Sequence, residues 1–257
     1  MVTKPDVSQA VRTAKLICVD TSQNHNKQWV AWVMPNGDLY VEYGRVGYTQ
    51  QSRLHSYRSV SAAENRLTQL MREKLGKGYQ PALVEDTPGE QLDFSLLKAD
   101  EADFIRRRLQ RLQGHAETIA QFVRLSFDIN RGVFRTALGV LSQEAIAQAR
   151  QRLRQVENCV RQGRLRQNPQ FGVAVAQYLE VIPLKVGMNL DPYLLLGQPE
   201  QVQSQNALLG ELEWVLAEVQ EIRLLIQEAI AQDAASGSDE RARWINWGAV
   251  QGENATL

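Results

Sequence analysis

Cysteine and histidine are scarce in this sequence. Its 257 residues contain two cysteines, Cys18 and Cys159, and three histidines, His25, His55 and His115. The cysteines do not form a Cys-x-x-Cys pair, so nothing indicates a zinc site or a redox framework. We expect two reduced, buried thiols, no metal site and no cofactor.

Long apolar runs are also missing. No apolar segment reaches the roughly 18 residues that a membrane-spanning helix needs, and the N-terminal residues lack the apolar stretch of a signal peptide. We therefore expect no membrane association and a cytoplasmic location. The 29 basic and 29 acidic side chains cancel, so the charge of the whole chain indicates nothing about a nucleic-acid partner.

Charge divides the chain in two. Residues 1–84 hold 11 basic and 6 acidic side chains, and an acidic segment with proline and glycine follows. We predict domains at residues 8–84 and 98–233, joined by a linker at 85–97, and expect each domain to fold on its own. A polar tail at residues 234–257 carries Trp244 and Trp247, which either form a docking peptide or return to the helices.

Strand signals dominate before the linker. Residues 14–20 and 28–34 are apolar and β-branched, residues 39–43 alternate, and 53–58 could add a fourth strand. The turn sequence Pro35–Asp38 makes the second and third runs a hairpin. A helix follows, with a capping box at Ser61–Glu64 and a stop at Gly76 and Gly78. This half is predicted to be a small α+β domain, an antiparallel sheet with one packed helix.

After the linker the pattern is helical, which predicts an all-α bundle. One helix should end at Gly114, and a second is marked by Ile119, Phe122, Val123 and Phe127. Ser142 and the pair Asn168-Pro169 provide N-terminal caps for two more. The predicted helices then cover residues 143–161, 169–181 and 199–231, the last of them divided or bent at Gly210.

An ordered set of short motifs lies between residues 12 and 82. Its members, in chain order, are Asn26-Lys27-Gln28-Trp29, Tyr43-Gly44-Arg45-Val46-Gly47, Gln50-Gln51-Ser52-Arg53, the capped helix and Gly76-Lys77-Gly78-Tyr79. The order resembles the WGR domain, which is named after Trp-Gly-Arg. Tyr43 stands where that family has tryptophan, and Gln50 or Gln51 stands where it usually has glycine.

The motif is suited to gripping the end of a nucleic acid. Gly44 and Gly47 let the backbone approach a ligand, Arg45 offers a planar fork to phosphate, and Tyr43 offers a face for stacking. In the alternative interpretation, the motif is only the end of a β-hairpin, with Tyr43 in the core and Arg45 in solvent. The resemblance implies contact with DNA ends. The residues predicted to bind nucleic acid are Tyr43, Gly44, Arg45, Gly47, Lys27, Gln51, Ser52, Arg53 and Lys77. More basic residues could extend this surface, namely Arg58, Arg66, Arg72 and Lys74.

Two passages of the helical half resemble the regulatory helical domain of poly(ADP-ribose) polymerases. They are residues 134–148, around Leu138–Ser142, and residues 182–203, which begin with IPLKVGMNLDPYLLL. In that family a transferase domain that binds NAD comes next. The segment after the last predicted helix is too short for it, so we expect no catalytic residues and no ADP-ribosyltransferase activity.

Arginine is concentrated in the first part of the helical half. Residues 104–166 hold 13 arginines and four acidic side chains, whereas residues 167–257 hold 4 basic and 12 acidic ones. Either the two parts face each other and neutralise, or Arg106, Arg107, Arg108 and Arg111 extend a nucleic-acid surface.

The function predicted from these features is non-catalytic nucleic-acid binding, with DNA preferred over RNA and DNA ends or breaks recognised by the first domain. One alternative is a regulatory subunit whose helical domain, or tail, docks on a separate enzyme. Another is a remnant of a larger enzyme that keeps the folds without a ligand. Dependence of nucleic-acid binding on salt separates the first from the others.

Overall fold

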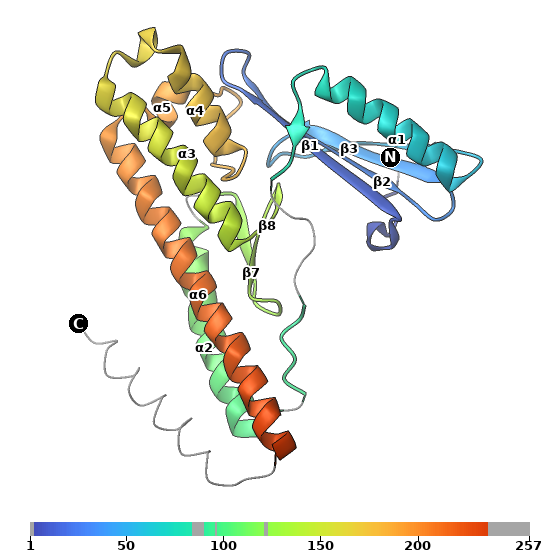
Figure 1. Ribbon diagram of the computed structural model, residues 1–257, viewed down its shortest axis with the longest axis vertical. Coiled ribbons are helices and arrows are strands. Elements are labelled where there is room, and N and C mark those ends of the chain that lie inside the picture. Colours follow the sequence, from blue (N-terminus) through green and yellow to red (C-terminus); the bar gives the residue numbers. More distant parts are fainter. Residues whose placement is uncertain (1–2, 84–89, 96, 121–122, 236–257) are drawn as a thin grey trace.

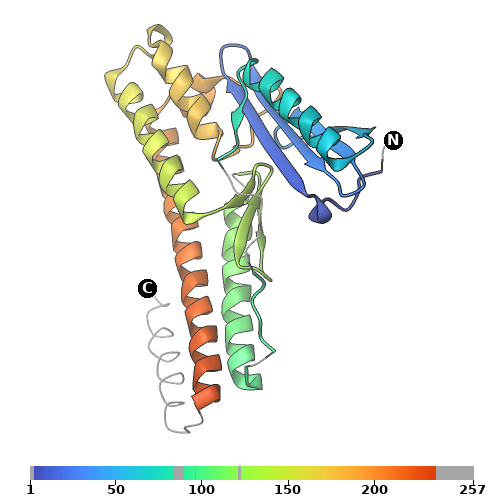
Figure 2. The ribbon, with the colours of Figure 1, turned by 45° about the vertical axis from the view of Figure 1, so that its right-hand side comes forward.

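The structure is a computed structural model that describes residues 3–83, 90–95, 97–120 and 123–235. A sheet with one helix forms the N-terminal domain, and a helix-rich domain follows. The sheet lies beside one end of the helical domain, next to α4, and the far ends of α2 and α6 point away from it (Figures 1 and 2).

The N-terminal domain is a five-stranded antiparallel sheet in the order β4-β3-β2-β1-β5. All four predicted strands are present, and a short fifth strand adds to β1. The elements are η1 (Val7–Gln9), β1 (Arg12–Asp20), β2 (His25–Val33), β3 (Asp38–Arg45), β4 (Gln51–Ser56), α1 (Val60–Leu75) and β5 (Gln80–Pro81).

The β2–β3 hairpin is confirmed at the predicted turn. Gly37 has a φ of +86°, and Asp38 donates its backbone N–H to the Asn36 side chain at 3.0 Å. Leu39 and Val41 of β3 face α1 and share its core with Ala63 and Leu67, none of them more than 5% exposed. The alternating apolar residues of β3 and the apolar stripe of α1 therefore pack against each other in one small core.

The N-terminal cap of α1 differs from the predicted one. Ser59 is the capping residue, and its side chain accepts a hydrogen bond from the backbone N–H of Ala62 at 3.2 Å. The capping box predicted at Ser61–Glu64 is wrong, because Ser61 already lies in the first turn of the helix. An N-cap needs extended backbone, and Ser59 has it, with φ −157° and ψ 160°.

The helical domain also contains a small antiparallel sheet in the order β6-β7-β8. Helix α6 packs along both α2 and α3, and α3 packs on α4. The elements are α2 (Ala99–Ile119), β6 (Leu125–Asp128), β7 (Val133–Thr136), β8 (Gly139–Leu141), α3 (Gln143–Gln162), η2 (Leu165–Gln167), α4 (Pro169–Leu179), α5 (Pro192–Leu196) and α6 (Pro199–Ala235).

The second predicted helix of this domain is wrong. Its apolar positions at Ile119, Val123 and Phe127 belong to the end of α2, an isolated bridge and β6. Phe127 lies across from Phe134 in the sheet, with ring centroids 5.2 Å apart. The β6–β7 turn contains Gly132 at a φ of +60°, which a helix does not allow.

Two glycines expected to end or divide helices do neither. Helix α2 runs through Gly114, and α6 runs through Gly210. Glycine within a helix costs about 1 kcal/mol relative to alanine. Around Gly114 that cost is offset by burial of Leu109, Leu112 and Ala116.

Ion pairs connect the arginine-rich part of the helical domain to its acidic part. Arg108 is 6% exposed and donates to Glu218 and Glu221 of α6. Arg150 forms a bidentate ion pair with Glu213, in which Nε donates to Oε1 at 2.9 Å and Nη2 donates to Oε2 at 2.7 Å. The two charged parts thus face and neutralise each other at these pairs, as one of the two interpretations predicted.

The two domains share apolar contacts. Ile17 of β1 and Val46, which follows β3, are 1% and 2% exposed and belong to the same core as Phe171 and Tyr178 of α4. Within the predicted linker, Leu92 packs with α2 and α6, and its backbone N–H donates to Asn130. The rest of the linker at 85–89 and 96, and the tail from residue 236 with both its tryptophans, lie outside the described residues.

Exchanging the capping serine for alanine tests the corrected start of α1. Ser59→Ala should lower the free energy of unfolding by about 1 kcal/mol, since the Ala62 N–H loses its acceptor. Ser61→Ala is the matched control and should change it by less than about 0.5 kcal/mol. Urea unfolding of both variants measures the difference, and an equal loss would contradict the assignment.

Candidate nucleic-acid interface

The predicted binding residues gather at one end of the sheet. Lys27 of β2 pairs with Arg45 of β3, and Tyr43 pairs with Trp29 on one side and Gln51 on the other. Because alternate residues of a strand share a face, Tyr43 and Arg45 lie on the same face as Val41, the face that α1 covers. Helix α1 ends at Leu75, near this end of the sheet.

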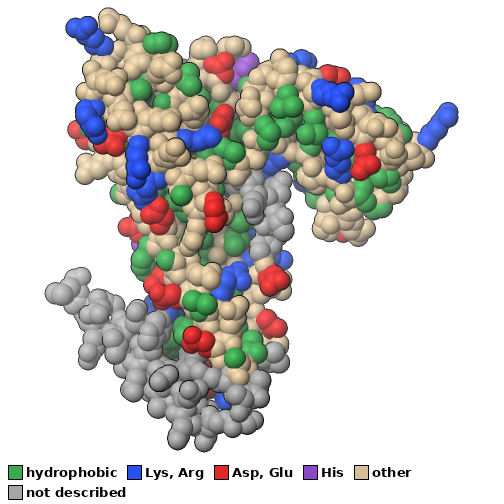
Figure 3. Space-filling view, in the orientation of Figure 1, with side chains coloured by type: hydrophobic (Ala, Val, Ile, Leu, Met, Phe, Trp, Pro, Cys, Tyr) green, Lys and Arg blue, Asp and Glu red, His purple; other side chains and the backbone are tan. Residues whose placement is uncertain are grey.

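Three lysines form a basic cluster here, which comprises Lys27, Lys74 and Lys77. The ammonium group of Lys74 lies 4.9 Å from the centre of the Tyr79 ring. Burial lowers the pKa of Lys74, and the positive charges of Lys77 and Lys27 lower it further. These charges therefore repel one another, and a bound anion would relieve that repulsion. Figure 3 shows how Lys and Arg side chains are spread over one face of the molecule.

Tyr43 lies at the edge of the core. Its half-buried ring packs against the cluster that contains Trp29 and Leu67, which agrees with the alternative that makes it a core residue. The guanidinium of Arg53, from the exposed edge strand β4, sits 5.7 Å from the ring centre. Gln51 and Ser52 precede Arg53 on that edge strand. The ring thus joins the core to a basic, exposed side chain.

Arg45 bonds to the protein at three acceptors. Its Nη1 donates to the backbone oxygen of Asn24 at 3.2 Å, and its Nη2 donates to Asn24 Oδ1 at 3.2 Å and to the backbone oxygen of Gly187 at 3.1 Å. Gly187 belongs to the helical domain. All three acceptors are neutral, so they hold the guanidinium in place without cancelling its charge.

Other residues extend this contact between the domains. Asn24 has a φ of 54°, donates to the backbone oxygen of Met188 at 3.0 Å and accepts from the Leu190 N–H at 2.7 Å. The Tyr48 hydroxyl donates to the backbone oxygen of Val186 at 3.1 Å. We call this contact the interdomain seam; it comprises Asn24, Arg45, Gly47, Tyr48, Arg124 and residues 186–190.

The two motif glycines are required by close neighbours. A Cβ on Gly44 would lie 2.7 Å from Gln50 Oε1, and the Gln50 amide donates to the backbone oxygens of Arg45 and Tyr48. Gly47 has a φ of +75°, and a Cβ there would overlap the Arg124 side chain. Arg124 donates to the Gly47 oxygen and lies over the Tyr48 ring. Gly44 and Gly47 thus leave room for the side chains of Gln50 and Arg124.

Sequence reasoning missed the residues that complete the seam. Asn24, Tyr48 and Arg124 were not among the predicted site residues, and Lys74 was only a possible extension. The polar run from residue 22 to residue 27 was a usable signal for Asn24, because asparagine tolerates positive φ. No local signal pairs Arg124 with Gly47, since they are 77 positions apart.

Comparison with known families assigns the first domain. Residues 13–86 match the WGR domain family. The chain contains a WGR domain. Its five strands and one helix lie almost wholly within the matched residues, from Arg12 to Pro81. The match ends before the helical domain, so the resemblance of that domain to the polymerase regulatory domain stays a prediction.

Whole-protein comparisons add little to this assignment. No curated protein matches the chain. A crystal structure of a protein from Bacteroides fragilis is 23% identical, with a TM-score of 0.26. The similarity covers 40% of this chain and 30% of that one, and the TM-score is too low to indicate a shared fold.

Among the described residues, the His, Cys, Asp and Glu side chains form no group of three or more that could hold a metal ion. Among the helices in this part of the chain, each is too short or too polar to cross a bilayer.

Substitution of Gly47 tests the close contact with Arg124. Gly47→Ala should lower the free energy of unfolding by more than the roughly 1–2 kcal/mol of left-handed strain alone, because the Cβ also displaces the Arg124 side chain. Gly78→Ala is the matched control, since Gly78 has a φ of +83° and a Cβ there meets nothing within 4 Å. If chemical denaturation gives equal losses, Arg124 does not hold this turn.

Proposed function

We propose that this chain is a nucleic-acid-binding protein that recognises DNA ends or breaks through its WGR domain, and that it acts by binding rather than by catalysis. WGR domains generally bind nucleic acid, which supports a DNA-binding role. The observation that carries the proposal is the basic cluster of Lys27, Lys74 and Lys77, gathered at the sheet end that bears the WGR motif.

The electrostatics of this sheet end favour a phosphate ligand. The three lysines lie close enough to lower the pKa of Lys74, and Arg53 adds a charge across the Tyr43 ring. Each phosphate that a lysine or arginine neutralises releases condensed counterions, which gives affinity without sequence preference. Lys77, Arg53 and Gln51 are exposed and can reach a ligand without rearrangement.

Arg45 has a second role in this proposal. Its bonds to Asn24 and Gly187 tie the sheet end to the helical domain, and its charge still adds to the local positive potential. We propose that Arg45 orients the binding surface and attracts phosphate over a distance, while Lys77 and Arg53 make direct contacts. Gly44 and Gly47 shape the turn on which this arrangement depends.

A protein partner is the second candidate function. Trp214 and Leu224 of α6 are both 48% exposed, so they offer apolar contact area to a partner. The face of α6 that carries them could dock on a separate enzyme. A partner that copurifies with the chain, together with no affinity for nucleic acid, would favour this regulatory role.

Removing an exposed lysine tests the DNA-binding proposal. Lys77→Ala should weaken binding to a blunt duplex by about 1.5–3 kcal/mol. It should also reduce the slope of log affinity against log salt by about 0.9, because one fewer phosphate is neutralised. Arg58→Ala is the control, as Arg58 is exposed in the same domain just before α1, whereas Lys77 follows that helix. Fluorescence anisotropy at several salt concentrations measures both quantities, and equal effects would contradict the proposed surface.

Two variants of Arg45 distinguish the effect of its charge from the effect of its hydrogen bonds. Arg45→Ala should lower the free energy of unfolding by about 1–3 kcal/mol, because it leaves acceptors in the seam unpaired, and it should also flatten the salt dependence. Arg45→Lys should lower stability similarly while keeping most of the salt slope. Thermal unfolding and DNA titration are run side by side. Parent-like stability of Arg45→Ala would mean that the seam does not depend on this residue.

A further inference from the structure

An open cleft lies where the two domains meet. Its volume is about 900 Å³, within the range of about 300–1,000 Å³ that is typical of ligand sites. The WGR domain contributes residues 18–23 and His25 together with Lys77 and Gly78, and the helical domain contributes η2, the exposed side of α4 and Tyr193. Because Lys77 belongs to the basic cluster as well, the cleft continues directly from the proposed duplex-binding surface.

The helical wall of the cleft carries a row of stacked side chains. The Arg166 guanidinium lies 4.9 Å from the centre of the Tyr193 ring, and that ring lies 5.4 Å from the buried ring of Phe171. The chain reverses before η2 at Gly163 and Arg164, both at positive φ, and so brings Arg166 to this wall. With Phe171 against the ring and Arg166 over its face, the outer side of the Arg166 guanidinium is the platform on which a base can stack.

Of the two carboxylates that line the cleft, Glu180 is neutralised by an arginine, whereas Asp20 accepts only from neutral donors and keeps its negative charge. Asp20 accepts from the Ser22 backbone N–H and hydroxyl and from the Gln23 N–H, at 2.6 to 3.2 Å. Glu180 accepts from Arg152 at 2.8 Å. Lys77 and Arg166 are exposed and belong to no such pair, so they are the cations that an anionic ligand would meet.

The remaining polar lining is rich in amides. Gln80, Gln167 and Gln177 line the cleft, and a side-chain amide both donates and accepts hydrogen bonds. Amides are the groups that proteins use to bond to the edges of bases. Cations, a stacking platform and amides together match the phosphates, rings and edges of unpaired nucleotides.

We propose that the interdomain cleft binds the single-stranded extension of a DNA end, while the adjoining duplex lies on the basic cluster. This inference rests on the proposed DNA-binding function. A duplex is too wide to enter a cleft of this volume, whereas one or a few unpaired nucleotides fit. The helical domain then contacts the nucleic acid itself, through Arg166 and Tyr193.

The test compares three duplexes of identical sequence bound by the full chain. One is blunt, one carries a short overhang of deoxyadenosines, and one carries an overhang of the same length made of abasic residues. The parent protein should bind the deoxyadenosine overhang about tenfold more tightly than the blunt end, the gain expected when one base stacks. The abasic overhang should keep only a small part of this gain.

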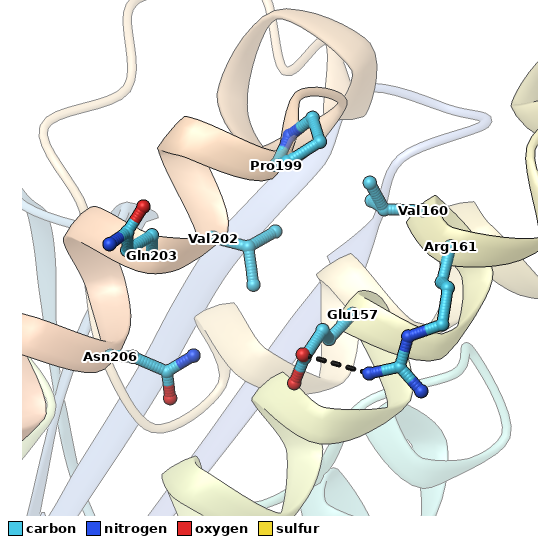
Figure 4. Close-up of a pocket in the computed structure, with 7 residues that line it drawn as sticks. All are labelled: Glu157, Val160, Arg161, Pro199, Val202, Gln203 and Asn206. Carbon is cyan, nitrogen blue, oxygen red and sulfur yellow. Dashed lines mark hydrogen bonds and ion pairs between the residues drawn. The ribbon is translucent and has the colours of Figure 1, made fainter.

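Two arginine variants locate the effect. Arg166→Ala should abolish the preference for the overhang and leave binding to the blunt duplex unchanged. Arg161→Ala is the matched control. Arg161 lies five residues earlier, is exposed and pairs with Glu157 at 2.9 Å. It borders a different hollow of about 380 Å³ between α3 and α6 (Figure 4).

The outcomes separate the two proposals. Tighter binding of the overhang that depends on Arg166 and not on Arg161 supports the cleft as the site. Equal binding of blunt and overhanging duplexes overturns the cleft and leaves the proposed function standing. An overhang preference that survives Arg166→Ala, or that Arg161→Ala removes equally, also overturns it. No binding to any of the duplexes overturns both proposals.

Discussion

The bonds from Arg45 and Asn24 to the loop at residues 186–190 set the relation between the two domains. Asn24 both donates to Met188 and accepts from Leu190, while Arg45 reaches Gly187. These contacts are polar and sit beside the apolar contact that Ile17 and Val46 make with the helical core. The apolar contact supplies most of the attraction between the domains. The hydrogen bonds fix one orientation, because donors and acceptors that moved apart would lose their partners. The interdomain cleft exists because that orientation is fixed.

The distribution of charge follows from this arrangement. Inside the helical domain, Arg108, Arg150 and Arg152 pair with glutamates of α6 and with Glu180, so part of the arginine excess is neutralised within the fold. At the end of α1, Lys74 lies instead within reach of the positive charges of Lys77 and Lys27. A chain of zero net charge therefore still presents a local positive surface. Arg166, on the far side of the cleft, is an arginine of the helical domain that lines the cleft.

Prediction from the sequence succeeded where local patterns and tertiary contacts agree. The β2–β3 hairpin follows from its alternating apolar residues and the turn at Gly37, and the start of α3 follows from Ser142, whose side chain accepts from the Ala145 N–H. It failed where the same spacing had two structural meanings. Ile119, Val123 and Phe127 fit a helical face, yet Phe127 pairs with Phe134 in a sheet. Likewise Ser61 and Ser59 are both plausible caps, and only backbone geometry chooses between them.

The sequence by itself determined the WGR domain, the helix-rich second domain and the identity of the residues gathered at the motif. These depend on turn chemistry and on periodic burial, which act over a few residues and can be read along the chain. The tertiary structure alone decided what those residues touch. Arg45 bonds to Gly187, 142 positions away, and Gly47 faces Arg124, 77 positions away. Such contacts form where the surfaces of the two domains meet in one orientation, and the spacing of residues along the chain does not predict them.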